Sequence, residues 1–268
     1  MHSLPFARPA LAFLVAACSA FAAFQTAAQT AAPAHKESFE PEVGQQGKDV
    51  VWVPTPQAVV DKMLDMARVT PKDFVMDLGS GDGRTVITAA KRGARAMGIE
   101  YNPDMVELSK RNAAKAGVSE RATFMKADLF QTDLSKATVI TMFLLPDINE
   151  KLRPKILRLK PGTRIVSNTF TMGDWKADQT STVDTAGGCE TSWCTALLWI
   201  VPARVGGTYK IPQGDLTLKQ QFQMVSGTLN SDGKSLPVTG KVLGEEISFS
   251  AGGKQYRGKL NGKQLELR

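Results

Sequence analysis

The 268-residue sequence predicts an α/β protein with a doubly wound, mostly parallel, Rossmann-like sheet, followed by a small antiparallel β domain at the C-terminus. Two observations support this prediction. In residues 51–204, short apolar runs alternate with segments of helical periodicity, which is typical of a mostly parallel sheet covered by helices on both faces. In residues 205–268, recurrent glycines separate short segments that alternate in polarity, as they do in β-hairpins.

The predicted elements of the first domain follow one another in a regular order. Thr55 is placed to cap a helix that Pro56 begins and that ends near residue 67. Apolar runs bounded by turn residues then predict strands at residues 74–78, 96–100, 123–126, 138–144, 164–168 and 195–201, and helical spacing predicts helices at residues 85–90, 103–116 and 149–159.

The composition is that of a folded chain. Hydrophobic residues make up 43% and charged residues 22%, which excludes a disordered, collagen-like or coiled-coil protein. Lys and Arg outnumber Asp and Glu by 33 to 26, a net charge of +7, but the charges are scattered and we interpret the excess as favouring solubility. With only two histidines, the sequence argues against a histidine-rich metal site, and we expect no metal.

Residues 1–28 predict a secretory signal peptide. Arg8 precedes an uncharged apolar run at residues 10–24, and small residues follow. The run is shorter than the roughly 20 residues that a membrane helix needs. A retained anchor and lipid attachment at Cys18 are the alternatives. Residues 29–50 are polar and aperiodic and predict a flexible linker. We therefore expect an exported protein, periplasmic or secreted, with no membrane span in the mature chain.

Removal of the signal peptide leaves two cysteines, Cys189 and Cys194. Disulfides form in exported proteins, and this spacing suits a link between two strands across a turn. We expect the two cysteines to be paired, with two free thiols as the alternative.

A glycine-rich turn follows the first predicted strand. Gly79, Gly81 and Gly83 let the backbone turn sharply and let a ligand approach closely. The turn lies at the carboxyl edge of the sheet, where α/β proteins bind ligands. Arg84 stands where the dinucleotide fingerprint needs its third glycine, which disfavours an NAD enzyme. A P-loop is excluded because no Gly-Lys-Ser/Thr sequence follows.

Carboxylates end the first three strands. Asp77 lies beneath the glycine turn, where it would attract a cationic ligand group such as an α-ammonium. Glu100 is placed to accept hydrogen bonds from both hydroxyls of a ribose. Asp128 is placed to accept one from the amino group of adenine, with Leu129 or Phe130 against the ring.

The order of the turn and the acids resembles the class I, seven-β-strand S-adenosylmethionine-dependent methyltransferases over roughly residues 51–204. The resemblance implies that S-adenosylmethionine is the cofactor. It also implies that the methionine part is held by the turn, the ribose by the second-strand acid and the adenine by the third, with the cofactor-binding residues Asp77, Gly79, Gly81, Gly83, Glu100, Asp128 and Leu129.

Shorter motifs carry a narrower resemblance. Val53-Pro54-Thr55-Pro56, the glycine turn, GIEYNP and Phe143-Leu144-Leu145-Pro146 are similar to a small group of protein-lysine methyltransferases whose mitochondrial members modify the adenine nucleotide translocase and the c-ring protein of the ATP synthase. This resemblance implies that Thr55 forms a lip near the methyl donor. It implies that Leu145 and Pro146 line the acceptor site. Ordinary turn chemistry of proline is the alternative for both motifs.

The predicted function is methyl transfer to a protein lysine. The Asn/Asp-Pro-Pro-aromatic motif of enzymes that methylate bases or glutamine amides is absent after the fourth strand, which argues against a nucleic acid substrate. Lysine suits an apolar channel, because desolvation lowers its pKa of about 10.4. A small-molecule N- or O-methyltransferase and a donor-binding protein without turnover are the alternatives. We expect a monomer, and five aromatic residues are candidates for a channel wall: Trp52, Tyr101, Trp175, Trp193 and Trp199, the last of them more typical of the core.

Overall fold

The computed structural model describes residues 1–2, 39–262 and 264–268. The description below concerns the compact unit Phe39–Arg268. The predicted signal peptide from residue 3 onward, with Cys18, and residues 29–38 of the predicted linker lie outside the described residues. In the part of the chain that is described, no helix is both long and apolar enough to cross a membrane.

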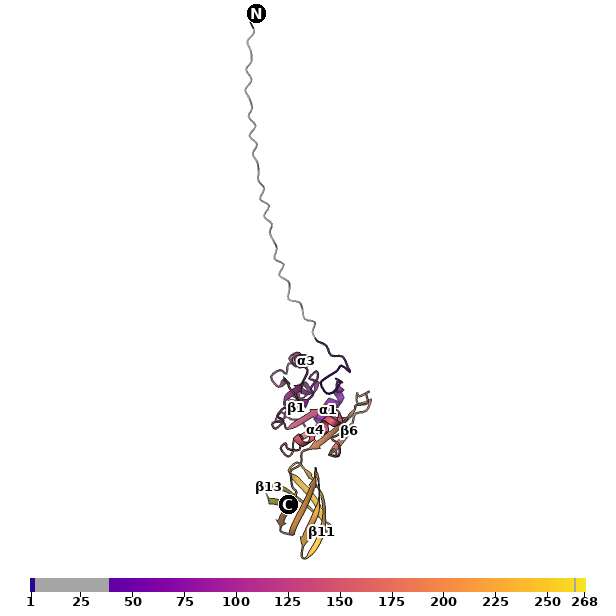
Figure 1. The fold of residues 1–268 in the computed structure, drawn as a ribbon, viewed down its shortest axis with the longest axis vertical. Coiled ribbons are helices and arrows are strands. Elements are labelled where there is room, and N and C mark those ends of the chain that lie inside the picture. Colours follow the sequence, from indigo (N-terminus) through magenta and orange to yellow (C-terminus); the bar gives the residue numbers. More distant parts are fainter. Residues whose placement is uncertain (3–38, 263) are drawn as a thin grey trace. The chain divides into compact units, whose positions relative to one another are not determined.

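The first region is a seven-stranded sheet with helices (Figure 1). The strand order is β3-β2-β1-β4-β5-β7-β6, with parallel pairing from β3 to β5 and antiparallel pairing of β7 with β5 and β6. This confirms the mostly parallel sheet. Its strands are β1 (Phe74–Leu78), β2 (Arg95–Glu100), β3 (Ala122–Lys126), β4 (Val139–Met142), β5 (Arg164–Asn168), β6 (Gln179–Thr182) and β7 (Thr195–Ile200), and its helices are α1 (Gln57–Met66), α2 (Arg84–Lys91), α3 (Pro103–Lys115) and α4 (Pro146–Ile156).

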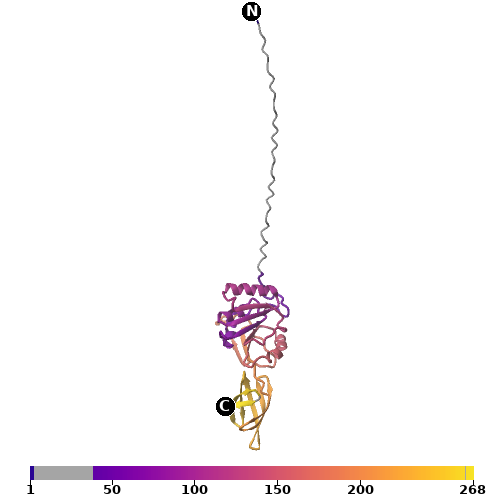
Figure 2. The same ribbon diagram turned by 90° about the vertical axis from the view of Figure 1, so that its left-hand side faces the viewer.

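Apolar cores cover both faces of this sheet. Successive strand residues point to opposite faces, so Val75 packs with Val60 of α1 and with residues of α2 and α3 on one face. Its neighbour Met76 packs with Leu152 of α4 on the other face. The sheet is therefore enclosed between helices, as the apolar character of its strands predicts (Figure 2).

Two predicted helix starts differ from the structure. The N-cap residue of α1 is Pro56, with no side-chain cap bond, so Thr55 does not cap this helix. Helix α4 begins at Pro146 rather than at Asn149. Proline is favoured in the first turn of a helix because its ring fixes φ at a helical value and its missing N–H is not needed there. The preceding strand β4 accordingly ends at Met142.

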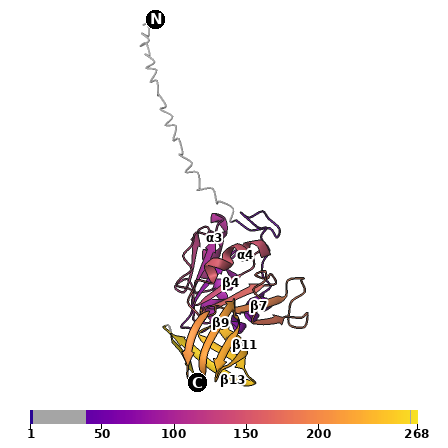
Figure 3. The same cartoon turned by 60° about the horizontal axis from the view of Figure 1, so that its bottom comes forward.

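The C-terminal region is an antiparallel sheet in which each strand pairs with the next along the chain (Figure 3). Residues such as Leu216, Val242 and Phe249 form its own buried core. The first and last strands approach each other, so the sheet curls nearly into a barrel. The strands are β8 (Gly207–Ile211), β9 (Gly214–Gln221), β10 (Met224–Ser231), β11 (Lys234–Leu243), β12 (Glu246–Ala251), β13 (Lys254–Asn261) and β14 (Gln264–Leu267).

Polar and aromatic contacts join the two sheets. The carboxylate of Asp178, whose side chain is 2% exposed, lies 2.8 Å from the Nζ of Lys241 on β11 and accepts a hydrogen bond of 2.8 Å from the backbone N–H of Ile200 on β7. The ring of Phe222 stacks on Trp175 with centroids 5.9 Å apart. The C-terminal sheet therefore packs directly on the first region.

Candidate active site

The chain reverses its progress through the first sheet between β1 and β4. From β1 it proceeds outward to β2 and β3, and it then returns to add β4 and β5 on the other side of β1. In open α/β sheets, ligands bind outside the carboxyl ends of the strands at such a reversal. A cavity of about 220 Å³ lies there, lined by the ends of β1 and β2, by residues 47–55, 127–129 and 142–145, and by Phe170 and Trp193.

The glycine turn at this cavity needs glycine for two reasons. Gly79, Gly81 and Gly83 have φ values of 74°, 54° and 83°, a region that residues with a Cβ rarely adopt. In addition, a Cβ on Gly81 would lie 2.5 Å from the indole Nε1 of Trp52. Gly79 and Gly81 line the cavity, whereas Gly83 is the N-cap residue of α2.

Helix α3 supports the turn from below. The buried Ser109 hydroxyl donates a hydrogen bond of 2.7 Å to the backbone carbonyl of Gly81. The Asn112 amide donates one of 2.9 Å to the carbonyl of Asp82. Sequence reasoning did not assign these two residues, because each is one polar position on a helix face and no spacing links it to the turn.

Glu100 lies at the end of β2 and faces the turn. Its Oε2 accepts a hydrogen bond of 3.0 Å from the Gly81 N–H, and its Oε1 accepts bonds from the N–H groups of Tyr101 and Asn102 at 2.8 and 2.9 Å. A carboxylate has about four acceptor positions. These contacts therefore fix the side chain at the cavity wall and leave acceptor capacity for a ligand hydroxyl, in keeping with the predicted ribose contact.

Asp77 is buried at the end of β1, with 6% of its surface exposed. Burial raises the pKa of its carboxyl group to about 7, against the lowering effect of a 2.6 Å hydrogen bond from the Thr141 hydroxyl, and the nearby acids Asp82 and Glu100 raise it further. A cationic group in the cavity would stabilise the ionised form. The site is thus built to gain from a positively charged ligand.

Asp128 also lines the cavity, and its two oxygens already have partners. Oδ2 lies 2.7 Å from the Nζ of Lys48, and Oδ1 accepts a hydrogen bond of 2.8 Å from the Phe130 N–H. The hydrogen bond from Lys48 lowers the pKa of the Asp128 carboxyl group. Leu129 lines the cavity beside it. An adenine amino group at Asp128 would share that carboxylate with Lys48, and the adenine assignment stays a prediction.

Residues 44–52 form a loop over the donor side of the cavity. The Gly44 N–H donates to the Trp52 carbonyl at 2.8 Å, and the Trp52 N–H donates to the Gln45 carbonyl at 2.9 Å. Within this loop, Lys48 lies 4.9 Å above the ring of Tyr101. The last residues of the predicted 29–50 linker therefore form bonded structure at the site. A polar, aperiodic composition gave no sign of it.

The other end of the cavity is apolar. Thr55 and Leu145 line it as predicted, whereas Pro146 begins α4 and is not among the lining residues. The ring of Phe143 stacks on Phe170 with centroids 5.7 Å apart and meets Trp193 at 6.1 Å and 61°. Of the five aromatic candidates, Trp52, Tyr101 and Trp193 line the cavity. Trp175 and Trp199 are fully buried in the core.

Arg84 fixes the lip formed by Thr55. Its guanidinium pairs with the Asp82 carboxylate at 2.7 Å and donates a hydrogen bond of 2.9 Å to the backbone carbonyl of Thr55. The glycine turn and the lip are therefore held by one ion pair. In the sequence, Arg84 stands out only as the residue that breaks the dinucleotide fingerprint. Its position directly after the turn was the signal that it touches the site.

The residues at the donor end fit S-adenosylmethionine. A buried carboxyl group suits the cationic methionine end, a carboxylate on β2 suits ribose hydroxyls, and three glycines with positive φ leave room for close backbone approach. The fold and this site define a class I S-adenosylmethionine-dependent methyltransferase.

Comparisons with known proteins agree. Residues 77–179 match the family model of the ANTKMT methyltransferase domain. A protein-lysine N-methyltransferase from Saccharolobus islandicus (strain REY15A) is 46% identical over 138 residues, which are 50% of this chain and 86% of the relative. The adenine nucleotide translocase lysine N-methyltransferase of Mus musculus is 37% identical over 119 residues, 44% of this chain and 52% of the relative.

Among solved structures, an RNA methyltransferase from Salinibacter ruber in complex with S-adenosyl-L-homocysteine is 45% identical, with a TM-score of 0.52, and the match covers 57% of this chain and 96% of that one. The chain thus spans nearly all of some relatives but only about half the length of the mouse protein. The chain belongs to the group of class I methyltransferases that contains the lysine methyltransferases of the adenine nucleotide translocase and of the ATP synthase c-ring protein.

Proposed function

We propose that this protein transfers the methyl group of S-adenosylmethionine to the ε-amino group of a lysine in another protein. The observation that carries the proposal is the composition of the acceptor end of the cavity. Apart from Thr55, the side chains that line this end are apolar or aromatic: Val53, Pro54, Phe143, Leu144, Leu145, Ile148, Phe170 and Trp193. A long alkyl side chain fits such a wall by burying its methylene groups.

The donor end orients the cofactor through this chain's own groups. Bound S-adenosylmethionine supplies an electrophilic methyl group on a sulfonium. Asp77, once ionised, attracts the cationic methionine end, and Glu100 is held by three backbone N–H groups so that its free acceptor capacity faces the cavity. The glycine turn allows close approach of the backbone. These contacts leave the methyl group to face the apolar end.

The acceptor end prepares the lysine. A lysine in water is protonated at neutral pH and has no lone pair for attack. The apolar walls disfavour the ammonium and so lower its pKa, and the proton passes to water at the mouth before the amine attacks the methyl carbon. The ion pair of Arg84 with Asp82 keeps the Thr55 lip in place during this step.

The names of relatives support two acceptor classes. The Saccharolobus relative is named a protein-lysine methyltransferase, and the Mus musculus relative is named for lysine in the adenine nucleotide translocase. The Salinibacter structure is described as an RNA methyltransferase. We favour lysine, because the apolar end of the cavity provides no side chain that pairs with the edge of a base, and we keep RNA as the second candidate.

One labelling experiment tests the function. The purified chain is incubated with methyl-tritiated S-adenosylmethionine and, in parallel, with the protein fraction, the RNA fraction and the small-molecule fraction of the native host. Acid hydrolysis of the protein fraction should yield labelled Nε-methyl-lysine. A Gly81→Val chain serves as the matched control, since it should transfer no label.

Each other outcome selects an alternative. Label in the RNA would replace lysine with a nucleic acid acceptor, and label in the small-molecule fraction would establish a small-molecule methyltransferase. Binding of the donor by calorimetry, with no S-adenosylhomocysteine formed in any fraction, would make the chain a binding protein.

We also propose that the chain is exported, on the evidence of Arg8, the apolar run at residues 10–24 and the small residues that follow. The Cys189–Cys194 disulfide supports an oxidising compartment. Export requires a source of donor outside the cytoplasm. Intact-mass measurement on protein from the native host tests the proposal: a mature chain should start near Gln29. A mass that includes residues 1–28 would contradict export, and a lipid on Cys18 would mean a tethered exported protein.

A further inference from the structure

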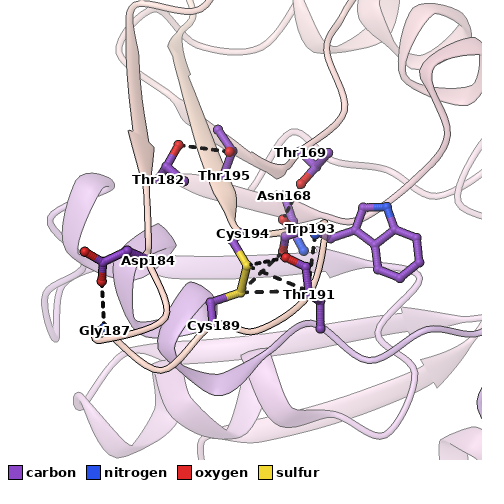
Figure 4. Close-up of a disulfide and its surroundings, with 10 residues drawn as sticks. All are labelled: Asn168, Thr169, Thr182, Asp184, Gly187, Cys189, Thr191, Trp193, Cys194 and Thr195. Carbon is purple, nitrogen blue, oxygen red and sulfur yellow. Dashed lines mark hydrogen bonds between the residues drawn. A yellow bond between two sulfur atoms is a disulfide. The ribbon is translucent and has the colours of Figure 1, made fainter.

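The disulfide predicted from the sequence is present and closes a short loop just before β7. Cys189 and Cys194 are joined, with their Cα atoms 5.9 Å apart. Both cysteines are buried, at 3% and 7% exposure, and belong to the core formed with α1 and α2. The loop between them therefore has both ends anchored in the interior of the first region (Figure 4).

Trp193 is the residue of this loop that reaches the cavity. Its side chain remains 36% exposed although the adjacent Cys194 is buried. Its backbone N–H donates a hydrogen bond of 3.2 Å to the Thr191 hydroxyl within the same loop. The loop backbone is tied back as well, because the Val183 N–H donates to the Cys194 carbonyl at 2.8 Å and the Cys189 N–H donates to the Asp184 carbonyl at 3.1 Å.

The indole of Trp193 completes an aromatic wall. It meets the ring of Phe143 at 6.1 Å, and Phe143 stacks on Phe170 at 5.7 Å. The three rings come from three separate segments and line the same end of the cavity. Aromatic faces attract alkylammonium groups, and this attraction persists as methyl groups are added to the nitrogen, because the group stays cationic.

We propose that Trp193 is an acceptor-site residue that binds the side chain of the substrate lysine, and that the Cys189–Cys194 disulfide is a positioning device that holds its indole at the cavity. This inference rests on the proposed function. The loop lies beyond residues 77–179, which match the family model, so family membership alone does not supply it. Reduction of the disulfide frees the loop from its second anchor and lets the indole leave the wall.

The experiment compares four variants with the full-length wild-type chain: Trp193→Ala, Trp193→Phe, the double variant Cys189→Ser/Cys194→Ser, and the triple variant that combines the serines with Trp193→Ala. The matched control is Glu190→Ala, an exposed residue of the same loop that does not line the cavity. Initial rates of lysine methylation are measured against the concentration of the host protein fraction. Donor affinity is measured by calorimetry.

We expect Trp193→Ala to raise the apparent KM for the protein fraction about tenfold, the scale of a desolvated cation–π contact, with donor affinity changed less than twofold. Trp193→Phe should recover most of the loss. The double serine variant should raise KM about fivefold. The triple variant should be no worse than Trp193→Ala alone, because the disulfide acts through the indole. Glu190→Ala should behave as wild type.

The outcomes separate this inference from the proposed function. If the wild type makes no Nε-methyl-lysine, the proposed function fails. If the wild type makes it and Trp193→Ala matches Glu190→Ala, only the role of Trp193 fails. If the serine substitutions lower activity further in the Trp193→Ala background, or weaken donor binding as much as acceptor use, the positioning role is overturned. Dithiothreitol treatment of the wild type provides an independent comparison should the serine variants fold poorly.

Discussion

The two ends of the cavity are built in different ways. The donor end uses carboxylates and backbone N–H groups from one stretch of chain, residues 77–102, which contains β1, the glycine turn and β2. The acceptor end assembles apolar side chains from four separate places: residues 53–55, residues 143–148, Phe170 and Trp193. A contiguous polar motif can be kept while scattered apolar positions change. The difference explains how proteins with one donor site can be named for lysine or for RNA.

The largest expected effect comes from Gly81→Val, which should destroy the donor end alone. The new side chain would need a positive φ and would collide with Trp52 Nε1, which lies 2.5 Å from the Cβ position. Affinity for S-adenosylmethionine, measured by calorimetry, should fall at least 100-fold, or about 2.7 kcal/mol. Gly117→Val is the matched control. Its φ is also positive, at 69°, but nothing lies within 4 Å of its Cβ position. Equal affinities of the two variants would remove Gly81 from the site.

Glu100→Ala should have the next largest effect on the donor end. It removes the acceptor of three backbone hydrogen bonds and the predicted ribose contact. Donor binding should weaken by about 1.5–3 kcal/mol, the scale of hydrogen bonds to a charged group. Glu107→Ala, at an exposed glutamate on α3 paired with Lys110, is the control and should leave donor binding unchanged. Calorimetry that gives Glu100→Ala the affinity of the wild type would contradict the assignment.

Asp77 should make donor affinity depend on pH. Its pKa is about 7 in the free protein, so the ionised fraction grows from pH 5.5 to 7.0, while the α-ammonium of the donor, with a pKa near 7.7–8.0, stays charged. Affinity should rise on the order of tenfold over this range, because the ionised carboxylate attracts the cation. Asp77→Asn should abolish the slope. A flat profile in the wild type would mean that Asp77 does not face the donor.

The same group should act on stability with the opposite sign. The folded pKa of Asp77, about 7, lies above the unfolded value near 3.9. Its contribution to stability is therefore fully present below about pH 4 and is lost as the pH rises through 7. Urea unfolding of the free wild type and of Asp77→Asn at several pH values measures this difference. A contribution that grows with pH would contradict the raised pKa.

Leu145→Ala should have the smallest effect, and it should fall on the acceptor end. The side chain is 42% exposed at the cavity mouth, so its removal loses a contact of about 1 kcal/mol. The apparent KM for the protein fraction should rise about threefold to fivefold, with donor affinity unchanged. Leu243→Ala, at a leucine 48% exposed on β11, is the control for loss of a surface leucine. Equal effects on donor and acceptor would show that the two ends are not separate.

The difference between the two ends also decided what the sequence could predict. Strands β1 and β5 have the predicted bounds, 74–78 and 164–168, because each is a short apolar run between turn residues. The glycine turn, Asp77 and Glu100 were found for a related reason: each lies at or directly after the end of a buried strand. Class, fold and cofactor therefore followed from local pattern and are confirmed. The roles of the individual donor-site residues stay predictions.

Long-range packing was harder to predict. The stacking of Phe143 on Phe170 joins residues that follow different strands, and no spacing in the sequence links them. Lys48 lies 80 positions from Asp128, in a segment whose polarity predicts a linker. The cysteine pair and Trp193 were each noted in the sequence, but their meeting with Phe143 depends on how the loop before β7 folds back over the sheet.

Asp178 has a consequence for how the whole chain unfolds. Its carboxylate is almost fully enclosed, with Lys241 of the C-terminal sheet on one side and the Ile200 N–H of the first sheet on the other. Opening the C-terminal sheet would leave an enclosed charge without its partner, which typically costs about 3–5 kcal/mol. The two sheets should therefore melt together in a single cooperative transition, and a chain cut after residue 204 should lose stability beyond the strands that it lacks.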